Sequence, residues 1–232
     1  QTITWTGAGD GTNWSDPNNW NLLAIPTIDN DVIIPQASTI TINNHVLIKS
    51  ITVNENSVIT LNDGISFTEP SSFEDNVIVN WHFGAIANYY PSFGVAFTNK
   101  GTININRLTP SFNAPQFWGT TFNNEGVVNL IYGYLIISGG LVNNQTTGII
   151  DIQSDESGIA GGIDGIGPIY NYGIVKKTIG TGESRICPIM ENFGTIEILT
   201  GELYFCDYSY ISLNNRTEGT IKGTGTFNVA TN

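Results

Sequence analysis

The oxygen-bearing side chains whose types and spacing suit metal binding gather near the start of the chain. Asp10, Asn13 and Asp16 lie in the stretch WTGAGDGTNWSDPNNW, which begins at Trp5. Carboxylate and amide oxygens at short spacing are the ligands that Ca²⁺ prefers. Asx turns use the same residue types without a metal, and no EF-hand spacing is present. Calcium is therefore one of two interpretations of this loop, and no other cofactor is expected.

Catalytic residue types are sparse in the rest of the chain. Acidic residues flank glycines in SDESGIAGGIDGIG, residues 154–167, where paired carboxylates would suit glycoside hydrolysis. A solvated loop also needs acids for solubility alone. The chain has only two histidines, His45 and His82, and no cysteine has a histidine beside it, so the nucleophile–base arrangements of hydrolases are not indicated. We expect a protein that is not an enzyme.

Aromatic residues offer a different chemistry, because flat rings stack on sugar faces and exposed apolar patches usually mark contacts. Trp81, Tyr89, Tyr90 and Trp118 fall in a proline-containing stretch, residues 81–122, which lacks a clean strand pattern. They are the candidate ligand-binding residues for carbohydrate. The competing interpretation is a small aromatic core that pins this stretch to the rest of the fold.

The charge balance excludes several partner classes. The 232 residues include 20 acidic and 8 basic ones, for a net charge of −12, which disfavours nucleic acid and anionic lipid surfaces. No apolar run is long enough to span a bilayer, so membrane insertion is not expected. Charged residues make up only 12%, and a chain that begins at Gln1 rather than Met is expected either where a leader has been removed or where the sequence is cut from a longer chain. These features favour an extracellular or cell-surface protein.

The elements that must position these residues follow a repeat. An Asn-x-Gly unit opens NKGTINI, NEGVVNL, NYGIVKK and NFGTIEI, and two variants carry an insertion before the glycine. The glycines recur every 21–25 residues, which is typical of a solenoid. Asparagines at such corners can stack on one another from coil to coil as an amide ladder. The units begin at Asn99, Asn124, Asn144, Asn171, Asn192 and Asn215.

Short stretches of alternating Thr and Ile or Val between these corners predict strands with one buried face. By the same alternation Lys176 and Lys177 lie on opposite faces, so one of them is expected inside or at a ladder edge. No stretch has a helical period. The sequence therefore predicts an all-β fold, a right-handed parallel β-helix with about 21–25 residues per coil.

We expect one domain over residues 1–232, in which Trp5, Trp14 and Trp20 cover the first coil as a cap. A repeat runs close to Asn232 without a bulky cap after it, which predicts an open last coil able to accept another subunit. The expected parts are an N-terminal cap (1–36), first coils (37–80), an irregular aromatic-rich insertion (81–122) and regular coils (123–232).

The opening tryptophan-rich stretch, DNDVIIP at 29–35 and the Asn-x-Gly units resemble the β-helical stalk and repeat regions of large secreted bacterial adhesins and surface proteins. The resemblance implies architecture and secretion, and it carries no catalytic residues. Cys187 and Cys206 fit no metal motif, and a disulfide or two buried thiols both remain open.

These observations favour a secreted structural or adhesion β-helix that associates with itself or with neighbouring coils of a longer protein. The rival hypothesis is a carbohydrate-binding or carbohydrate-active β-helix that uses residues 81–122 to contact a surface polysaccharide. A third is an ice-binding face, since Thr39, Thr41 and Thr52 form short outward rows.

Overall fold

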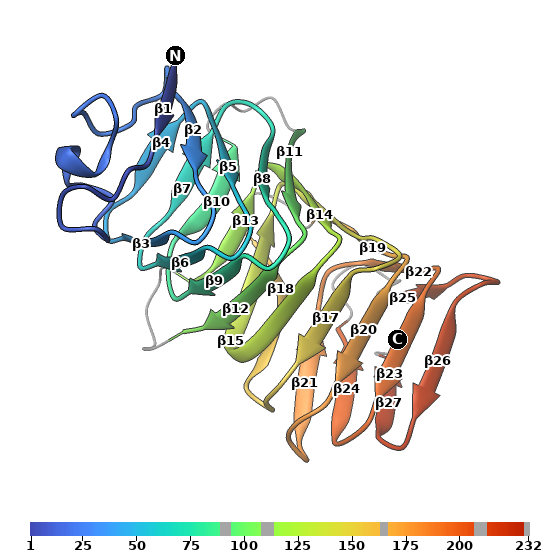
Figure 1. Cartoon of the computed structure of the whole chain (residues 1–232). Helices are drawn as coiled ribbons and strands as arrows, with labels where there is room; N and C mark the ends of the chain where they lie inside the picture. The colour runs from blue at the N-terminus through green and yellow to red at the C-terminus, as the bar shows by residue number, and fades with distance from the viewer. Residues whose placement is uncertain (89–93, 108–113, 163–166, 207–212, 230–232) are drawn as a thin grey trace.

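The computed structural model describes residues 1–88, 94–107, 114–162, 167–206 and 213–229. The chain winds repeatedly around one axis, and nearly every coil contributes one strand to each of three parallel stacks. The coils follow one another from the N-terminal to the C-terminal end (Figure 1). The predicted parallel β-solenoid is thus confirmed.

Stack 1 is a 10-stranded sheet in which every neighbouring pair is parallel. Its strands are β1 (Thr2–Thr4), β2 (Asp31–Ile34), β5 (Ser50–Val53), β8 (Ser71–Phe73), β11 (Val95–Asn99), β14 (Thr120–Asn124), β16 (Leu141–Asn144), β19 (Ile169–Asn171), β22 (Met190–Asn192) and β25 (Leu213–Asn215).

Stacks 2 and 3 form the other two sides of the coil, and the long strand β15 (Val127–Ser138) runs through both. Stack 2 holds the first half of β15 with β3 (Thr39–Ile42), β6 (Val58–Leu61), β9 (Ile78–Trp81), β12 (Thr102–Asn106), β17 (Ile149–Ile152), β20 (Ile174–Lys177), β23 (Thr195–Ile198) and β26 (Thr220–Gly223). Stack 3 holds the second half of β15 with β4 (Val46–Ile48), β7 (Ile65–Phe67), β10 (Ala85–Asn88), β13 (Gln116–Trp118), β18 (Ser157–Gly161), β21 (Glu183–Ile186), β24 (Glu202–Phe205) and β27 (Thr226–Val229).

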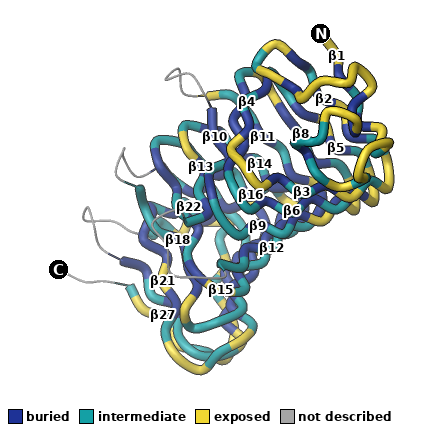
Figure 2. Tube along the Cα trace, turned by 90° about the vertical axis from the view of Figure 1, so that its left-hand side faces the viewer, coloured by how far each residue is buried: buried dark blue, intermediate teal, exposed yellow. Residues whose placement is uncertain are grey.

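Alternation along each strand decides which side chains fill the interior. In β23 the inward residues Ile196 and Ile198 are buried, whereas Thr195 and Glu197 stay partly exposed. Each buried branched aliphatic side chain contributes about 1.5–3 kcal/mol relative to exposure. Buried segments line the inside of the coil, and exposed ones gather at its corners and at the N-terminal loops (Figure 2). The core is therefore one continuous column.

An internal ladder of asparagines follows one corner of the solenoid, at the end of the stack 1 strands. Asn99, Asn124, Asn144, Asn171 and Asn192 are each 0% exposed. Each Nδ2 donates to Oδ1 of the ladder asparagine in the next coil, at 2.6–2.9 Å. The predicted amide ladder is confirmed, and its sequence spacings of 20–27 residues measure the coil.

The glycine of each Asn-x-Gly corner is required by close stacking. A Cβ on Gly126 would lie 2.1 Å from the carbonyl oxygen of Gly101 in the coil before it, and one on Gly173 would lie 2.2 Å from that of Gly148. Neither Gly126 nor Gly173 has a positive φ. Positive φ angles occur instead at Gly133 and Gly201, where they are 89° and 64°.

Residues 81–122 differ from the predicted irregular insertion, since β10 to β14 continue all three stacks through this stretch. Trp81, Phe97, Phe117 and Phe122 of this stretch lie in the core. Phe117 stacks on Phe122 with ring centroids 4.0 Å apart, and Phe97 stacks on Phe122 at 5.8 Å. The prolines and bulky rings obscured the alternation that forms these strands. Residues 89–93 and 108–113 of this stretch lie outside the described part of the chain.

Candidate functional site

The N-terminal segment covers the first coil on two of its three sides. Strand β1 extends stack 1 beyond β2. At stack 2, Trp14 N donates to Thr41 O at 3.1 Å and Thr41 N donates to Thr12 O at 2.8 Å. The three predicted cap tryptophans come together here, all buried, with Trp20 in edge-to-face contact with both Trp5 and Trp14. The tryptophans therefore cover the apolar interior at this end of the column, whereas in stack 3 the first strand, β4, pairs with β7 alone among the described strands.

Each of the three predicted calcium ligands accepts hydrogen bonds within the cap through a side-chain oxygen. Asp10 Oδ1 accepts from the backbone N–H groups of Asn13 and Thr12, and these bonds lower the pKa of Asp10. Asp16 accepts from the backbone N–H groups of Asn18 and Asp10, which lowers the pKa of Asp16. Asn13 Oδ1 accepts from Ser15 N. The geometry supports the Asx-turn interpretation of this loop.

The candidate carbohydrate residues do not form one surface in the described part of the chain. Trp81 is fully buried, because its register partners Leu61 and Ile105 both point into the core, and its Nε1 donates to Phe83 O at 2.9 Å. Its assignment as a binding residue was therefore wrong. Trp118 is 45% exposed on the outer face of β13. Tyr89 and Tyr90 lie outside the described residues.

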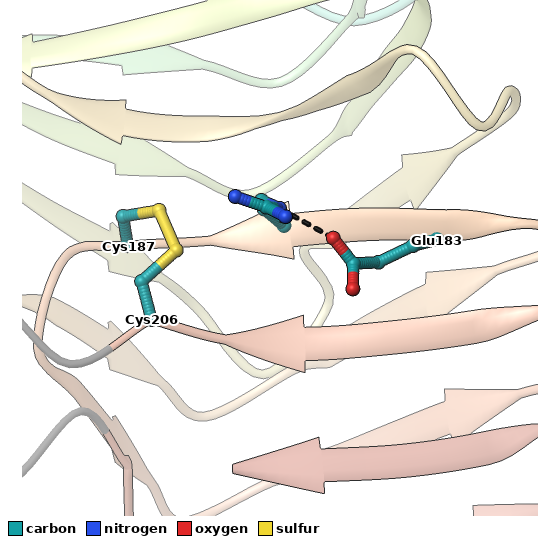
Figure 3. Close-up of a disulfide and its surroundings, with 4 residues drawn as sticks. Glu183, Cys187 and Cys206 are labelled. Carbon is teal, nitrogen blue, oxygen red and sulfur yellow. Dashed lines mark hydrogen bonds and ion pairs between the residues drawn. A yellow bond between two sulfur atoms is a disulfide. The ribbon is translucent and has the colours of Figure 1, made fainter. Parts of the chain in front are cut away.

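Cys187 and Cys206 are joined by a disulfide, at the ends of β21 and β24 in adjacent coils of stack 3 (Figure 3). Both half-cystines are nearly buried. The nearby ion pair between Arg185 and Glu183 lies on the outer face of β21. The disulfide therefore joins the coils of β21 and β24, one coil before the last described strand of stack 3, β27.

The last described coil differs from the first in what covers it. Strands β25, β26 and β27 each pair on one side only among the described residues. The side chains that continue the core here are only partly buried, in contrast to their equivalents in earlier coils. They are Leu213, Ile221, Phe227 and Val229. The described edge thus offers unpaired backbone groups beside apolar side chains, which favours strand addition.

A buried lysine lies at the corner between stacks 2 and 3. Lys177 is 0% exposed, and its Nζ donates to Asp155 Oδ1 at 2.8 Å, Ser184 Oγ at 2.9 Å and Ile179 O at 3.2 Å. The alternation of the lysine pair predicted that one would be inside, but it could not name the partners. Asp155 lies one coil earlier in the chain. The sequence signal that could have identified this partner is therefore an opposite charge one coil away, here 22 residues.

The outer face of stack 2 carries a column of alternating charges that sequence analysis missed. Asp151, Lys176, Glu197 and Lys222 are in register in successive coils. Lys176 pairs with Asp151 at 3.5 Å, and Lys222 pairs with Glu197 at 3.2 Å. Opposite charges directly across neighbouring strands stabilise a sheet. Their separation of one coil in the sequence could have predicted this column.

Comparison with known proteins identifies no relative. No protein-family model, curated protein or solved structure matches the chain. Within the described ranges, no three His, Cys, Asp or Glu side chains gather in a way that could hold a metal ion. The same ranges contain no helix long and apolar enough to cross a membrane. Function must therefore be argued from the geometry of the coil itself.

Proposed function

We propose that this chain is a structural β-solenoid segment of a secreted or cell-surface protein, without enzymatic activity of its own. It acts as a stiff spacer, and its C-terminal coil accepts further parallel strands from following coils or from another copy. The observation that carries the proposal is the asymmetry of the two ends. At one end buried tryptophans cover the apolar interior, and at the other the apolar side chains of the last described coil are only partly buried.

The interior supports a mechanical role. Side chains fill the column in every described coil, and the asparagine ladder bonds successive coils along one edge. Each coil contacts mainly its neighbours, so length can change without altering the cross-section. These properties are expected of a spacer such as an adhesin stalk.

The surface and the disulfide support the proposed location. Charged residues are only 12% of the chain, and outward strand positions carry Thr, Asn and Ser in their place. Disulfides persist in oxidising compartments and are rare in reducing ones. Cys187 and Cys206 therefore favour an extracellular setting.

Size-exclusion chromatography with light scattering and electron microscopy, over a range of concentrations, tests the open edge. We expect end-to-end association that grows with concentration. Replacing Ile221 and Phe227 together by lysine should abolish it, because charges on the last coil oppose strand addition. Because solenoid coils depend mainly on their neighbours, the preceding coils should keep their circular dichroism signal.

The control variant replaces Leu22 and Leu23 by lysine, since these exposed residues lie at the tryptophan-covered end. It should associate like the unmodified chain. A protein that stays monomeric at all concentrations, or one whose association depends on Leu22 and Leu23 instead, would contradict the role of the open edge.

A further inference from the structure

Three successive coils build a cleft at the corner between stacks 2 and 3. Strand β15 passes through this corner without a break and bends at Gly133, whose φ is 89°. The bend places Tyr132 and Tyr134 on either side of Gly133. Tyr132 is in register with Asn106 of the preceding coil, and Tyr134 with Gly158 of the following one.

Arg107 forms the wall of the cleft contributed by the preceding coil. Its backbone N–H donates to Tyr132 O at 3.1 Å. A Cβ on Gly133 would lie 3.0 Å from the Cβ of Arg107 and 3.3 Å from its Cδ. The glycine therefore makes room for the aliphatic stem of Arg107 against the floor of the cleft.

Glu156 forms the opposite wall, contributed by the following coil. Gly133 N donates to Glu156 O at 3.2 Å, which fixes this loop against β15. The Tyr132 hydroxyl donates a hydrogen bond to the Glu156 carboxylate, and this bond raises the pKa of Tyr132 above its usual value. Tyr132 is still 41% exposed, so its ring stays accessible.

Asp155 also lines the cleft, and hydrogen bonds to both of its carboxylate oxygens fix its side chain. Its Oδ1 accepts from the buried Lys177 at 2.8 Å, and its Oδ2 accepts from Thr181 N at 3.1 Å. The cation beneath it offsets its charge. The cleft thus combines two rings, one guanidinium and two carboxylates on a rigid strand framework, which is the support that a binding site requires.

The cleft is open to solvent, has a volume of about 360 Å³ and is lined by Arg107, Tyr132, Gly133, Tyr134, Asp155 and Glu156. A volume of this size suits one or two sugar rings. A larger groove of about 530 Å³, lined by residues from Pro35 to Glu74, has no aromatic side chain among its described lining residues. From the convergence of rings with fixed donors and acceptors, we propose that the cleft binds a neutral saccharide unit.

The charges decide in favour of a neutral ligand. Lys177 offsets the charge of Asp155, so it is the Glu156 carboxylate, together with the net charge of −12, that opposes an anionic sugar such as a uronate. Arg107 on the other wall opposes an amine. Sugar hydroxyls both donate and accept, so they match carboxylate acceptors and guanidinium donors together, while tyrosine rings cover the apolar C–H face. The site differs from the aromatic surface expected from sequence and does not depend on the spacer role.

Saturation-transfer NMR and titration calorimetry on the full chain test the proposal, with methyl glucoside, methyl galactoside, N-acetylglucosamine and two disaccharides as probes. We expect a dissociation constant of about 1 mM for at least one of them. Tyr132→Ala should weaken binding about tenfold through the lost ring contact. Glu156→Gln, which keeps the shape, should weaken it about tenfold through the lost charged acceptor.

Tyr172→Ala is the matched control, because Tyr172 is 42% exposed but stacks on Phe193 at a different corner. It should leave the affinity unchanged. Absence of saturation transfer from every probe overturns the proposal, and so does tighter binding of glucuronate or glucosamine than of the neutral sugars. Equal losses in Tyr132→Ala and Tyr172→Ala would overturn the location. Thermal unfolding of each variant checks that the coil stays folded.

Discussion

Asn144 Nδ2 lies 2.7 Å from Asn171 Oδ1, and both amides are completely buried between adjacent coils. The same Nδ2 also donates to the backbone oxygens of Gly148 and Ile174, at 3.1 and 3.2 Å. One side chain therefore connects its own corner to the next coil through three acceptors. A buried polar group is stabilising only while its partners are present, which makes this contact a sensitive point of the fold.

Asn144→Ala should destabilise the chain by about 3 kcal/mol, because it leaves the amide of Asn124 and the oxygen of Asn171 buried without this partner. Asn143→Ala is the matched control. Asn143 is the adjacent residue, and its amide donates to Asn123 on the outer face, where water can replace it. Urea unfolding measures the free energy of unfolding of both variants. Equal losses would show that the buried ladder stabilises the fold no more than the exposed asparagine pair does.

Gly126→Ala should destabilise by about 1–3 kcal/mol, because the added methyl group meets a backbone oxygen at 2.1 Å and forces the two coils apart. Gly182→Ala provides the comparison, since its nearest heavy atoms lie at 3.2 Å, where a movement of a few tenths of an ångström is enough. Melting temperatures of the two variants should differ by several degrees. A harmless Gly126→Ala substitution would refute the close-stacking explanation.

Removing either partner of the buried ion pair should have unequal effects. Asp155→Asn leaves the ammonium of Lys177, which is 0% exposed, without a counter-charge, whereas Lys177→Met leaves a carboxylate that is 38% exposed to water. The first substitution should therefore be the more destabilising. Thermal unfolding at pH 7 gives the order, and a reversed order would show that Lys177 is satisfied by Ser184 and Ile179 alone.

The same pair predicts a pH dependence. The hydrogen bond from Lys177, followed by the backbone N–H of Gly182, lowers the pKa of Asp155 in the folded state. A lowered folded-state pKa gives stability that is complete above the unfolded-state pKa of about 3.9 and is lost as the pH falls through the folded-state value. Between about pH 5 and 2 the unmodified chain should lose more stability than Lys177→Met. Parallel pH profiles would contradict this assignment.

Reduction of the disulfide should lower the free energy of unfolding by about 3 kcal/mol, as expected for a closed loop with a sequence separation of 19 residues. The double variant Cys187→Ser, Cys206→Ser should reproduce the loss and no longer respond to reductant. Unfolding curves with and without a phosphine reductant make the measurement. A reductant effect that persists in the double variant would point to a cause other than this bond.

The repeat could be predicted from sequence because its marker, Asn-x-Gly, has a physical cause at both positions. The asparagine needs a partner above and below, and the glycine needs room for a neighbouring carbonyl. Trp81 could not be placed from sequence, because its burial depends on register with Leu61 and Ile105, which the aromatic and proline-containing context obscured. The cleft was missed because Arg107, Tyr132 and Glu156 are distant in sequence, although each lies about one coil from the next.

The asparagine ladder also has a direction. From Asn99 to Asn192 every described amide donates toward the C-terminus, and the acceptor always belongs to the coil that comes later in the chain. Each completed coil therefore presents an amide donor whose asparagine acceptor lies in the next coil. Such a chain is suited to folding from the N-terminus to the C-terminus. Each coil that emerges from a ribosome or a secretion pore can then add to the coils that have already folded next to the tryptophan cap.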